Sequence, residues 1–281
     1  MQAQIHAPRT GYAYNLLDNS DFRNPVNQRG QTTYTEGGYT IDRWKMASND
    51  TQLTVNNGYI TITNNAESGR VTVENILPEN HIGEVLTVAV CDHDTGNVYC
   101  MSGTVPEVDS TESQYFCSVD FNGNTLRLLL RDSGKLSVCI TVGNDASVHL
   151  RWAALYEGEY TADTLPPYQP KGYAAELAEC KRYYELLDSG TSQFVRAYKD
   201  DAIAFCIDYY EKRAVPVISM TGALGNALNV AGVGAVTPTS IESAAPIGRK
   251  SARVNAMGSF DTSETYAISY GIVRLSISAD L

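Results

Sequence analysis

The 281-residue sequence contains no apolar run of about 18 residues, the length that a membrane-spanning helix requires, so we expect no membrane insertion. We also expect no secretory signal, since the opening MQAQIHAPRTGY has no basic segment followed by an apolar one. Basic side chains are scarce: 21 Lys and Arg stand against 32 Asp and Glu, for a formal net charge of −11. Because phosphate binding needs clustered Lys and Arg, this balance argues against nucleic acid as a partner.

Catalytic motifs are absent as well. The four histidines lie far apart, and neither G-x-S-x-G nor H-E-x-x-H occurs. The glycine-rich stretch 222–234 lacks the G-x-G-x-x-G of a dinucleotide loop. Carboxylates are plentiful, and two could meet as a glycosidase pair, but nothing in the sequence selects which two. These absences favour a protein that is not an enzyme.

No two of the six cysteines form a C-x-x-C pair, and several fall at apolar positions of predicted strands. Buried free thiols are therefore expected in place of a disulfide framework or a zinc site. A Cys91–Cys100 bridge across a hairpin is the alternative.

Hairpin signals are abundant in the first half of the chain. Asn56-Asn57-Gly58 separates two alternating apolar segments, and Asn-Gly is the strongest short hairpin signal. Asp92–Asn97 and Arg131–Gly134 are similar turn sequences between apolar segments. Many short strands with regularly spaced turns predict a β-sandwich or jelly roll over about Asn15–Gly158.

Prolines at positions 166, 167 and 170 precede the one convincing helix. Proline donates no backbone hydrogen bond and biases its neighbours toward extended conformations, so these residues predict a short stiff connector. The helix is predicted over Ala174–Leu187, where good helix formers dominate. Leu177, Cys180, Tyr184 and Leu187 follow at 3-4-3 spacing, which would place them on one apolar stripe.

The second half is again predicted to be mostly strand, ending with Thr265–Ser278. The alternation in that last segment changes phase, which predicts a β-bulge near Ile272–Arg274. The overall prediction is an all-β protein with an N-terminal jelly-roll β-sandwich, a short connecting helix and a C-terminal β-sandwich tip domain. The predicted segments are residues 1–14 (lead), 15–165 (jelly roll), 166–188 (proline linker and helix) and 189–281 (tip domain).

Tyrosine is far more common than phenylalanine, with 18 residues against 6. A flat apolar face with a hydroxyl suits sugar stacking and wet interfaces. A carbohydrate-binding face is therefore predicted from Tyr34, Tyr39, Trp44, Tyr59 and Tyr99, with burial of Trp44 in the core as the alternative. Tyr34 and Tyr39 are favoured for the surface because GQTTYTEGGY has a loop-like composition. Replacing both with alanine is expected to weaken binding without unfolding the protein.

Three sets of short sequence motifs, taken together, indicate a protein family. They are NLLDNSDF, NQRG and YTIDRW near the start, HLRWAALYEGEYTADTLPPYQP followed by ELAECKRYYELL in the middle, and AVPVI with the terminal ADL. These phrases resemble tail-fibre and receptor-binding proteins of tailed bacteriophages and prophages, whose N-terminal module is akin to carbohydrate-binding jelly rolls. The resemblance covers most of residues 15–281.

The resemblance implies a homotrimer in the virion tail, made in the bacterial cytoplasm. Such a protein contacts other phage tail proteins, adheres to a bacterial surface polysaccharide and catalyses no reaction. Leu177, Tyr184 and Leu187 would supply an oligomer contact, although a helix of under two heptads is too short to hold a trimer alone. The small apolar stretch Gly222–Val236 is a second candidate for a subunit contact. The alternatives are a tail-associated glycan-degrading enzyme and a purely structural tail subunit.

Jelly rolls of the carbohydrate-binding type often hold a structural calcium, which this analogy places on Asn15, Asp21 and Glu157. Asp92–Asn97 also resembles the opening of a calcium loop. The twelfth position of that loop is Gly103, where a bidentate glutamate is required, so a plain hairpin turn is favoured.

Overall fold

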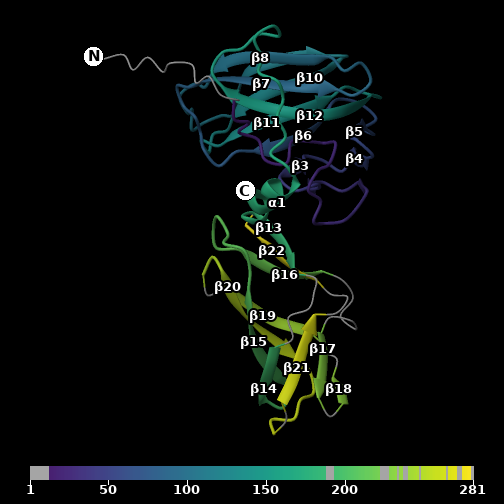
Figure 1. Cartoon of the computed structure of the whole chain (residues 1–281), viewed down its shortest axis with the longest axis vertical. Coiled ribbons are helices and arrows are strands. Elements are labelled where there is room, and N and C mark those ends of the chain that lie inside the picture. Colours follow the sequence, from purple (N-terminus) through teal and green to yellow (C-terminus); the bar gives the residue numbers. More distant parts are fainter. Residues whose placement is uncertain are drawn as a thin grey trace, which may run out of the picture. The chain divides into compact units, whose positions relative to one another are not determined.

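The computed structural model describes residues 13–187, 193–221, 228–232, 234–236, 240–246, 248–263, 265–270 and 274–279. Within these ranges the regular secondary structure is antiparallel strand apart from one helix, which confirms the predicted all-β class. Figure 1 shows these elements. The chain divides into two compact units, Met1–Leu177 and Ala178–Leu281. The predicted lead, residues 1–14, lies outside the described residues except for its last two.

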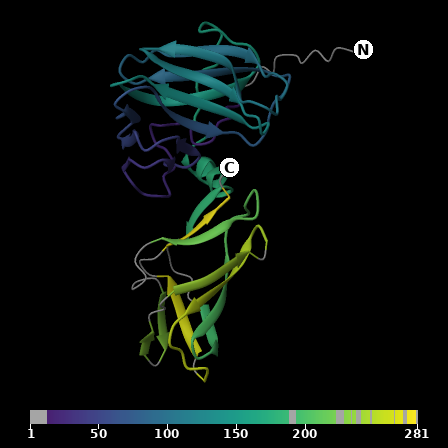
Figure 2. The ribbon, with the colours of Figure 1, turned by 180° about the vertical axis from the view of Figure 1, so that it is seen from behind.

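The first unit is a β-sandwich of two six-stranded sheets. In spatial order the first sheet contains β1 (Thr33–Tyr34), β4 (Thr51–Asn56), β5 (Tyr59–Asn64), β12 (Ser147–Glu157), β7 (Val85–Asp92) and β8 (Val98–Thr104). The second contains β2 (Gly38–Tyr39), β3 (Trp44–Met46), β6 (Val71–Ile76), β11 (Leu136–Val142), β10 (Asn124–Leu130) and β9 (Gln114–Phe121). Figure 2 shows the same strands from behind. The predicted sandwich is therefore confirmed.

The predicted hairpins form because each turn carries glycine where the backbone needs it. Asn56 pairs with Tyr59, which leaves Asn57 and Gly58 as a two-residue turn, and Gly58 has a φ of 90°. Only glycine adopts such a φ without strain from a Cβ atom. The turn between β10 and β11 likewise ends on Gly134, with a φ of 77°.

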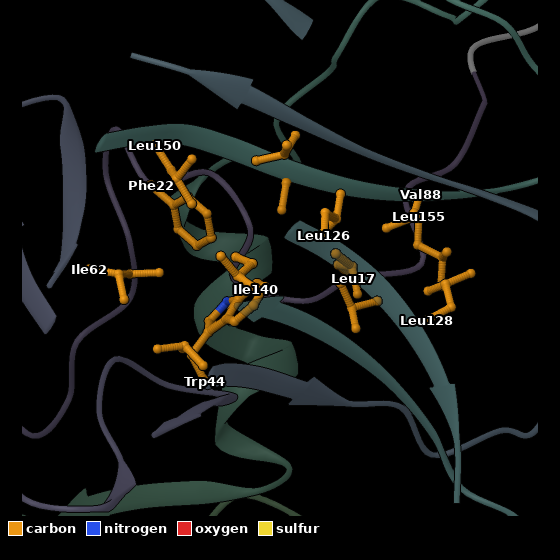
Figure 3. Close-up of a cluster of buried hydrophobic side chains, with 14 of the residues drawn as sticks. Leu17, Phe22, Trp44, Ile62, Val88, Leu126, Leu128, Ile140, Leu150 and Leu155 are labelled. Atoms are coloured by element: carbon orange, nitrogen blue, oxygen red, sulfur yellow. The ribbon is translucent and has the colours of Figure 1, made fainter. Parts of the chain in front are cut away.

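Alternating side chains from both sheets meet in one core, as Figure 3 shows. Trp44 belongs to this core and has no exposed surface, and its indole N–H donates to the Asn19 carbonyl oxygen at 2.8 Å. The Phe22 ring contacts it edge-on, with 5.1 Å between centroids. Asn19 in turn donates through its side-chain amide to the carbonyls of Val26 and Asp42. The irregular N-terminal segment is thus bound into the core by both apolar and polar contacts.

Residues 159–170, which include the three linker prolines, pack on the outer face of the first sheet. We call this segment the strap. Tyr168 stacks on Trp152 with 4.5 Å between ring centroids and 8° between planes. Tyr160 meets Tyr156 edge-on, and Leu165 packs against the same small cluster of β7 and β12 side chains. The proline segment is therefore not a free-standing connector, because its aromatic side chains bury part of the sandwich.

The helix is shorter than predicted. Helix α1 covers Tyr173–Lys181, and the chain then forms strand β13 (Tyr184–Leu187). The amides of Arg182 and Tyr183 bond to carbonyls three residues earlier, which closes the last turn. β13 pairs with β22 (Arg274–Ser278), so a distant strand overrides local helix propensity. In the part of the chain that the structure describes, no helix is long and apolar enough to cross a membrane.

The second unit contains two antiparallel sheets. The smaller one has the order β13, β22 and β16 (Val217–Thr221). The larger contains β18 (Gly234–Val236), β17 (Leu228–Gly232), β21 (Thr265–Tyr270), β14 (Gln193–Lys199), β15 (Ala202–Asp208), β20 (Ser251–Met257) and β19 (Ser240–Pro246). The segment predicted as one closing strand is thus two strands, β21 and β22, in different sheets. Residues 271–273, at the predicted bulge, lie outside the described residues.

All six cysteines are free thiols, as predicted, and the alternative Cys91–Cys100 bridge is not formed. Cys206 is exposed and Cys100 half-buried, whereas the other four are buried. Burial raises the pKa of Cys117 to about 11 and that of Cys139 to about 12. The buried thiols act as small apolar side chains of the core.

Candidate functional site

Two of the five predicted sugar-binding residues lie inside the sandwich. Trp44 is fully buried and Tyr34 is 5% exposed, and both belong to the main core. The Tyr34 hydroxyl donates to Asn27 Oδ1, and burial raises the pKa of Tyr34 to about 12. The expectation that Tyr34 lies on the surface is wrong, because Tyr34 belongs to the short edge strand β1 and its side chain is buried in the core. Neither residue can meet a ligand in the folded protein.

Tyr39 and Tyr99 are half-buried in separate places. Two cations lie over the Tyr39 ring: Arg29 at 5.5 Å and Lys45 at 5.8 Å from the centroid. Tyr99 packs against the main core, with its ring centroid 5.7 Å from that of Phe121. The five predicted residues therefore do not form one face.

Of the five predicted residues, Tyr59 is the one that has histidine and charged side chains close to it. It is half-buried at the start of β5, directly after the Asn57-Gly58 turn. His149 on β12 pairs with Thr61, two positions along β5, so His149 and Tyr59 share one face of the sheet. His93, in the turn after β7, donates its backbone N–H to the His149 carbonyl at 2.8 Å.

We call Tyr59, His93, Asp94, His149 and Arg151 the Tyr59 cluster. The Tyr59 and His93 rings stack with 4.0 Å between centroids and 13° between planes, and the His149 ring lies 5.4 Å from Tyr59. Arg151 Nε donates to His93 Nδ1 at 3.1 Å, which places the His93 ring proton on Nε2. His149 Nδ1 lies 2.9 Å from the Asp94 carboxylate. The cluster combines flat rings with hydrogen-bond donors and an acceptor.

Water reaches this cluster, since 35% of the His149 side chain and 60% of the Asp94 side chain are exposed. Behind it, Ile60 and Leu150 are fully buried, so the strands that carry the cluster are anchored by the core. Flat rings beside a few oriented polar groups are the usual composition of a site for small polar ligands. Sequence reasoning found Tyr59 but missed both histidines, which only strand pairing brings beside it.

The Asp92–Asn97 turn has the predicted hairpin form. Asp92 Oδ1 accepts hydrogen bonds from the backbone and hydroxyl of Thr95 at 2.8 and 2.9 Å, and Oδ2 accepts one from Asn122 at 2.9 Å. Burial alone would raise the pKa of Asp92, but these hydrogen bonds outweigh it and lower the pKa below its ordinary value. The carboxylate stabilises the turn that presents His93 and Asp94.

This lowered pKa predicts a pH-dependent contribution to stability. A carboxylate with a depressed folded pKa stabilises the fold above its unfolded pKa of about 3.9, and the contribution disappears as pH falls through the folded pKa. Asp92→Asn should therefore cost about 1–2 kcal/mol near pH 7 and less at pH 3, which lies below the unfolded pKa. Thermal unfolding of both proteins between pH 3 and pH 7 checks this. The exposed-carboxylate variant Glu112→Gln is the control, and an equal loss at both ends of the pH range would contradict the assignment.

The structure does not bring the three predicted calcium ligands together. Asn15 Oδ1 accepts hydrogen bonds from the backbone amides of Leu17 and Leu155, at 3.1 and 2.9 Å, which occupies both lone pairs. The Asp21 carboxylate accepts hydrogen bonds from the backbone amide and the guanidinium group of Arg23. Asp21 also forms a β-bridge with Trp152 of β12. Glu157 follows Trp152 by five positions on the same strand, so the two residues are roughly 16 Å apart along it. One cation cannot bridge that distance.

Glu157 lies instead beside His81 and Glu84, with ligand atoms of the three residues within 4.8 Å of one another. His81 Nδ1 is 2.7 Å from Glu84 Oε2. One imidazole with two carboxylates is a donor set for a transition metal such as Zn²⁺, whereas calcium prefers oxygen ligands alone. Among the described residues, these three are the group that could hold a metal ion.

The predicted oligomer-contact residues do not share one helical stripe. Leu177 is half-buried on α1, while Tyr184 is buried and Leu187 half-buried on β13. In the Gly222–Val236 stretch, residues 222–227 and 233 lie outside the described residues, and the rest form β17 and β18, which pair with each other. A subunit contact there stays a prediction.

No protein-family model, curated protein or solved structure matches this chain.

Proposed function

We propose that this chain is a carbohydrate-binding protein that catalyses no reaction. More specifically, we propose that it is the receptor-binding protein of a phage or prophage tail, assembled as a homotrimer with other tail proteins, and that it attaches to a bacterial surface polysaccharide. The Tyr59 cluster is the observation that supports binding. The sequence phrases around the first sandwich and the helix support the tail assignment.

The chemistry of the cluster suits a sugar. The apolar C–H face of a pyranose ring packs on aromatic rings, while its hydroxyls need both donors and acceptors. Arg151 supplies donors, Asp94 supplies acceptors, and His149 can serve as either. Stacking on His93 holds Tyr59 in one orientation, so less side-chain entropy is lost when a ligand binds.

A shallow site of this kind binds a single sugar weakly. Repeated polysaccharide units and three copies of the chain convert weak contacts into firm attachment, because each further contact is effectively intramolecular. Adhesion to a cell surface therefore needs no deep cleft in each copy.

Tyr59→Ala is expected to weaken binding to the polysaccharide about tenfold, since the ring contributes about 1–1.5 kcal/mol of stacking. Binding of the purified protein to an array of bacterial surface polysaccharides, followed by titration of the best one, measures this. The matched control is Tyr115→Ala, which removes a 50% exposed tyrosine from β9 in the other sheet. Equal binding by Tyr59→Ala and the unmodified protein would sink the site assignment.

The same polysaccharide tests the absence of catalysis. After prolonged incubation with the protein, the number of reducing ends and the chain length should be unchanged. A rise in reducing ends would favour the glycan-degrading enzyme. Binding to no polysaccharide, with the fold intact, would favour a purely structural subunit.

A further inference from the structure

Basic side chains gather at one place in the second unit. The chain has 21 Lys and Arg and a net charge of −11, so positive clusters are not expected from composition. Six basic residues nevertheless lie around one pocket. They are Lys181, Arg182, Lys212, Arg213, Arg249 and Lys250.

The pocket has a volume of about 500 Å³ and is lined by Arg182, Tyr210, Glu211, Lys212, Arg213 and Arg249. Four of these side chains are basic and one is acidic. The volume lies within the range of about 300–1,000 Å³ that is usual for small-molecule sites. Tyr210, 48% exposed, adds an aromatic face to the wall. The pocket can therefore hold one sugar unit together with a charged substituent.

Three segments form the pocket, and backbone hydrogen bonds hold them together. The Arg213 amide donates to the Arg182 carbonyl at 2.9 Å, joining the segment after α1 to the one between β15 and β16. The Lys212 amide donates to the Arg249 carbonyl at 2.7 Å, which joins the β19–β20 connection to them. The Arg182 and Arg249 side chains therefore project from a fixed frame and need little rearrangement to bind a ligand, whereas the Lys212 ammonium is buried against Glu185 and adds its charge from behind the pocket wall.

Side-chain contacts orient the cations further. Glu211 bonds Arg249 at 3.0 Å and Lys250 at 3.1 Å, and Arg182 pairs with Glu179 at 3.1 Å. The hydrogen bond from Lys250 is the largest of the effects that lower the pKa of Glu211. Arg249 is 54% exposed and Arg182 is 51% exposed, so both guanidinium groups remain accessible to a solute.

We propose that this pocket binds a phosphate or carboxylate group carried by the surface glycan. Guanidinium groups match both anions, because each donates paired N–H groups to two oxygens at once. The six basic residues outnumber the three carboxylates that pair with them, Glu179, Glu185 and Glu211, so an excess of positive charge remains that an anion would neutralise. That the anion is carried by a glycan rests on the proposed function. That the pocket binds an anion does not depend on it.

The test uses the full chain and two small probes, glycerol 3-phosphate and glucuronic acid, in calorimetric titrations at low salt. We expect saturable binding of at least one probe, weakened by added salt, and the stronger one identifies the anion. Arg249→Gln and Arg182→Gln should each weaken it about tenfold. The matched control is Arg253→Gln, which removes an arginine from β20 of the same unit and should leave binding unchanged.

Binding of neither probe, or an equal loss in Arg253→Gln, would overturn the proposal. Circular dichroism of each variant shows whether the fold is retained, and Arg249→Lys, which keeps the charge but not the paired N–H groups, should bind with intermediate strength. These titrations need no polysaccharide and leave Tyr59 intact. Their failure is thus distinguishable from failure of the polysaccharide-binding test on Tyr59.

Discussion

Trp44→Ala should lower the free energy of unfolding of the first unit by about 3–5 kcal/mol. Trp44 has no exposed surface, and its removal leaves a large cavity beside Phe22. It also leaves the buried Asn19 carbonyl without the indole N–H that it accepts. This loss is a large share of the roughly 5–15 kcal/mol that stabilises a typical domain.

Urea unfolding followed by tryptophan fluorescence measures this effect in the first unit alone. The chain has two tryptophans, Trp44 and Trp152, and both belong to that unit. Trp152 remains as the reporter in the variant. Trp44→Phe, which keeps most of the volume, should lose less, and Tyr59→Ala, which removes a half-buried side chain outside the core, should cost under about 1 kcal/mol. If Trp44→Ala matched Tyr59→Ala in stability, the core assignment of Trp44 would be untenable.

Lys212→Met should destabilise the second unit by a similar amount, about 3–5 kcal/mol. Lys212 is fully buried, and its ammonium lies 2.9 Å from Glu185 Oε2 and bonds the Lys181 carbonyl. Glu185 is 6% exposed, so removing the lysine leaves a buried carboxylate without its nearest cation. A buried ion pair contributes little net free energy to folding, but removing only one of its partners is strongly destabilising.

The double variant Lys212→Met, Glu185→Gln provides the control. Glutamine still accepts the hydrogen bond from the Tyr210 amide, which Glu185 Oε2 receives at 2.8 Å, and it carries no charge. We therefore expect the double variant to recover part of the lost stability. For Lys212→Met, the urea midpoint of the second unit, followed by circular dichroism, should fall. The midpoint of the first unit, followed by tryptophan fluorescence, should stay unchanged. Equal stability of the unmodified protein and Lys212→Met would contradict a structural role for this pair.

Local signals made most of the strands of the first unit predictable. Asn57-Gly58 and Gly134 mark turns through a backbone conformation that favours glycine, and the flanking alternation then sets which side chains face the core. The same signals could not reveal that Tyr34 points inward. That orientation depends on the pairing of Tyr34 with Leu53 across two strands.

The end of the helix is a clearer case of what local sequence signals cannot predict. Arg182 to Leu187 has reasonable helix propensity, yet Tyr184 pairs with Ser278, nearly a hundred positions away. Propensity acts within one turn of chain and carries no information about such a partner. The Tyr59 cluster has the same origin, since His93 and His149 reach Tyr59 only through the order of β5, β12 and β7.

The free thiols also have a practical consequence. The thiolate form of cysteine is the nucleophile that attacks thiol-reactive reagents, so burial and a raised pKa slow the reaction at Cys117 and Cys139. Cys206 is the one exposed cysteine of the six and belongs to the second unit, whereas both tryptophans belong to the first. A maleimide dye on Cys206 would therefore give each unit its own optical signal in the natural sequence. Ligand binding to either unit could then be followed separately without introducing a single substitution.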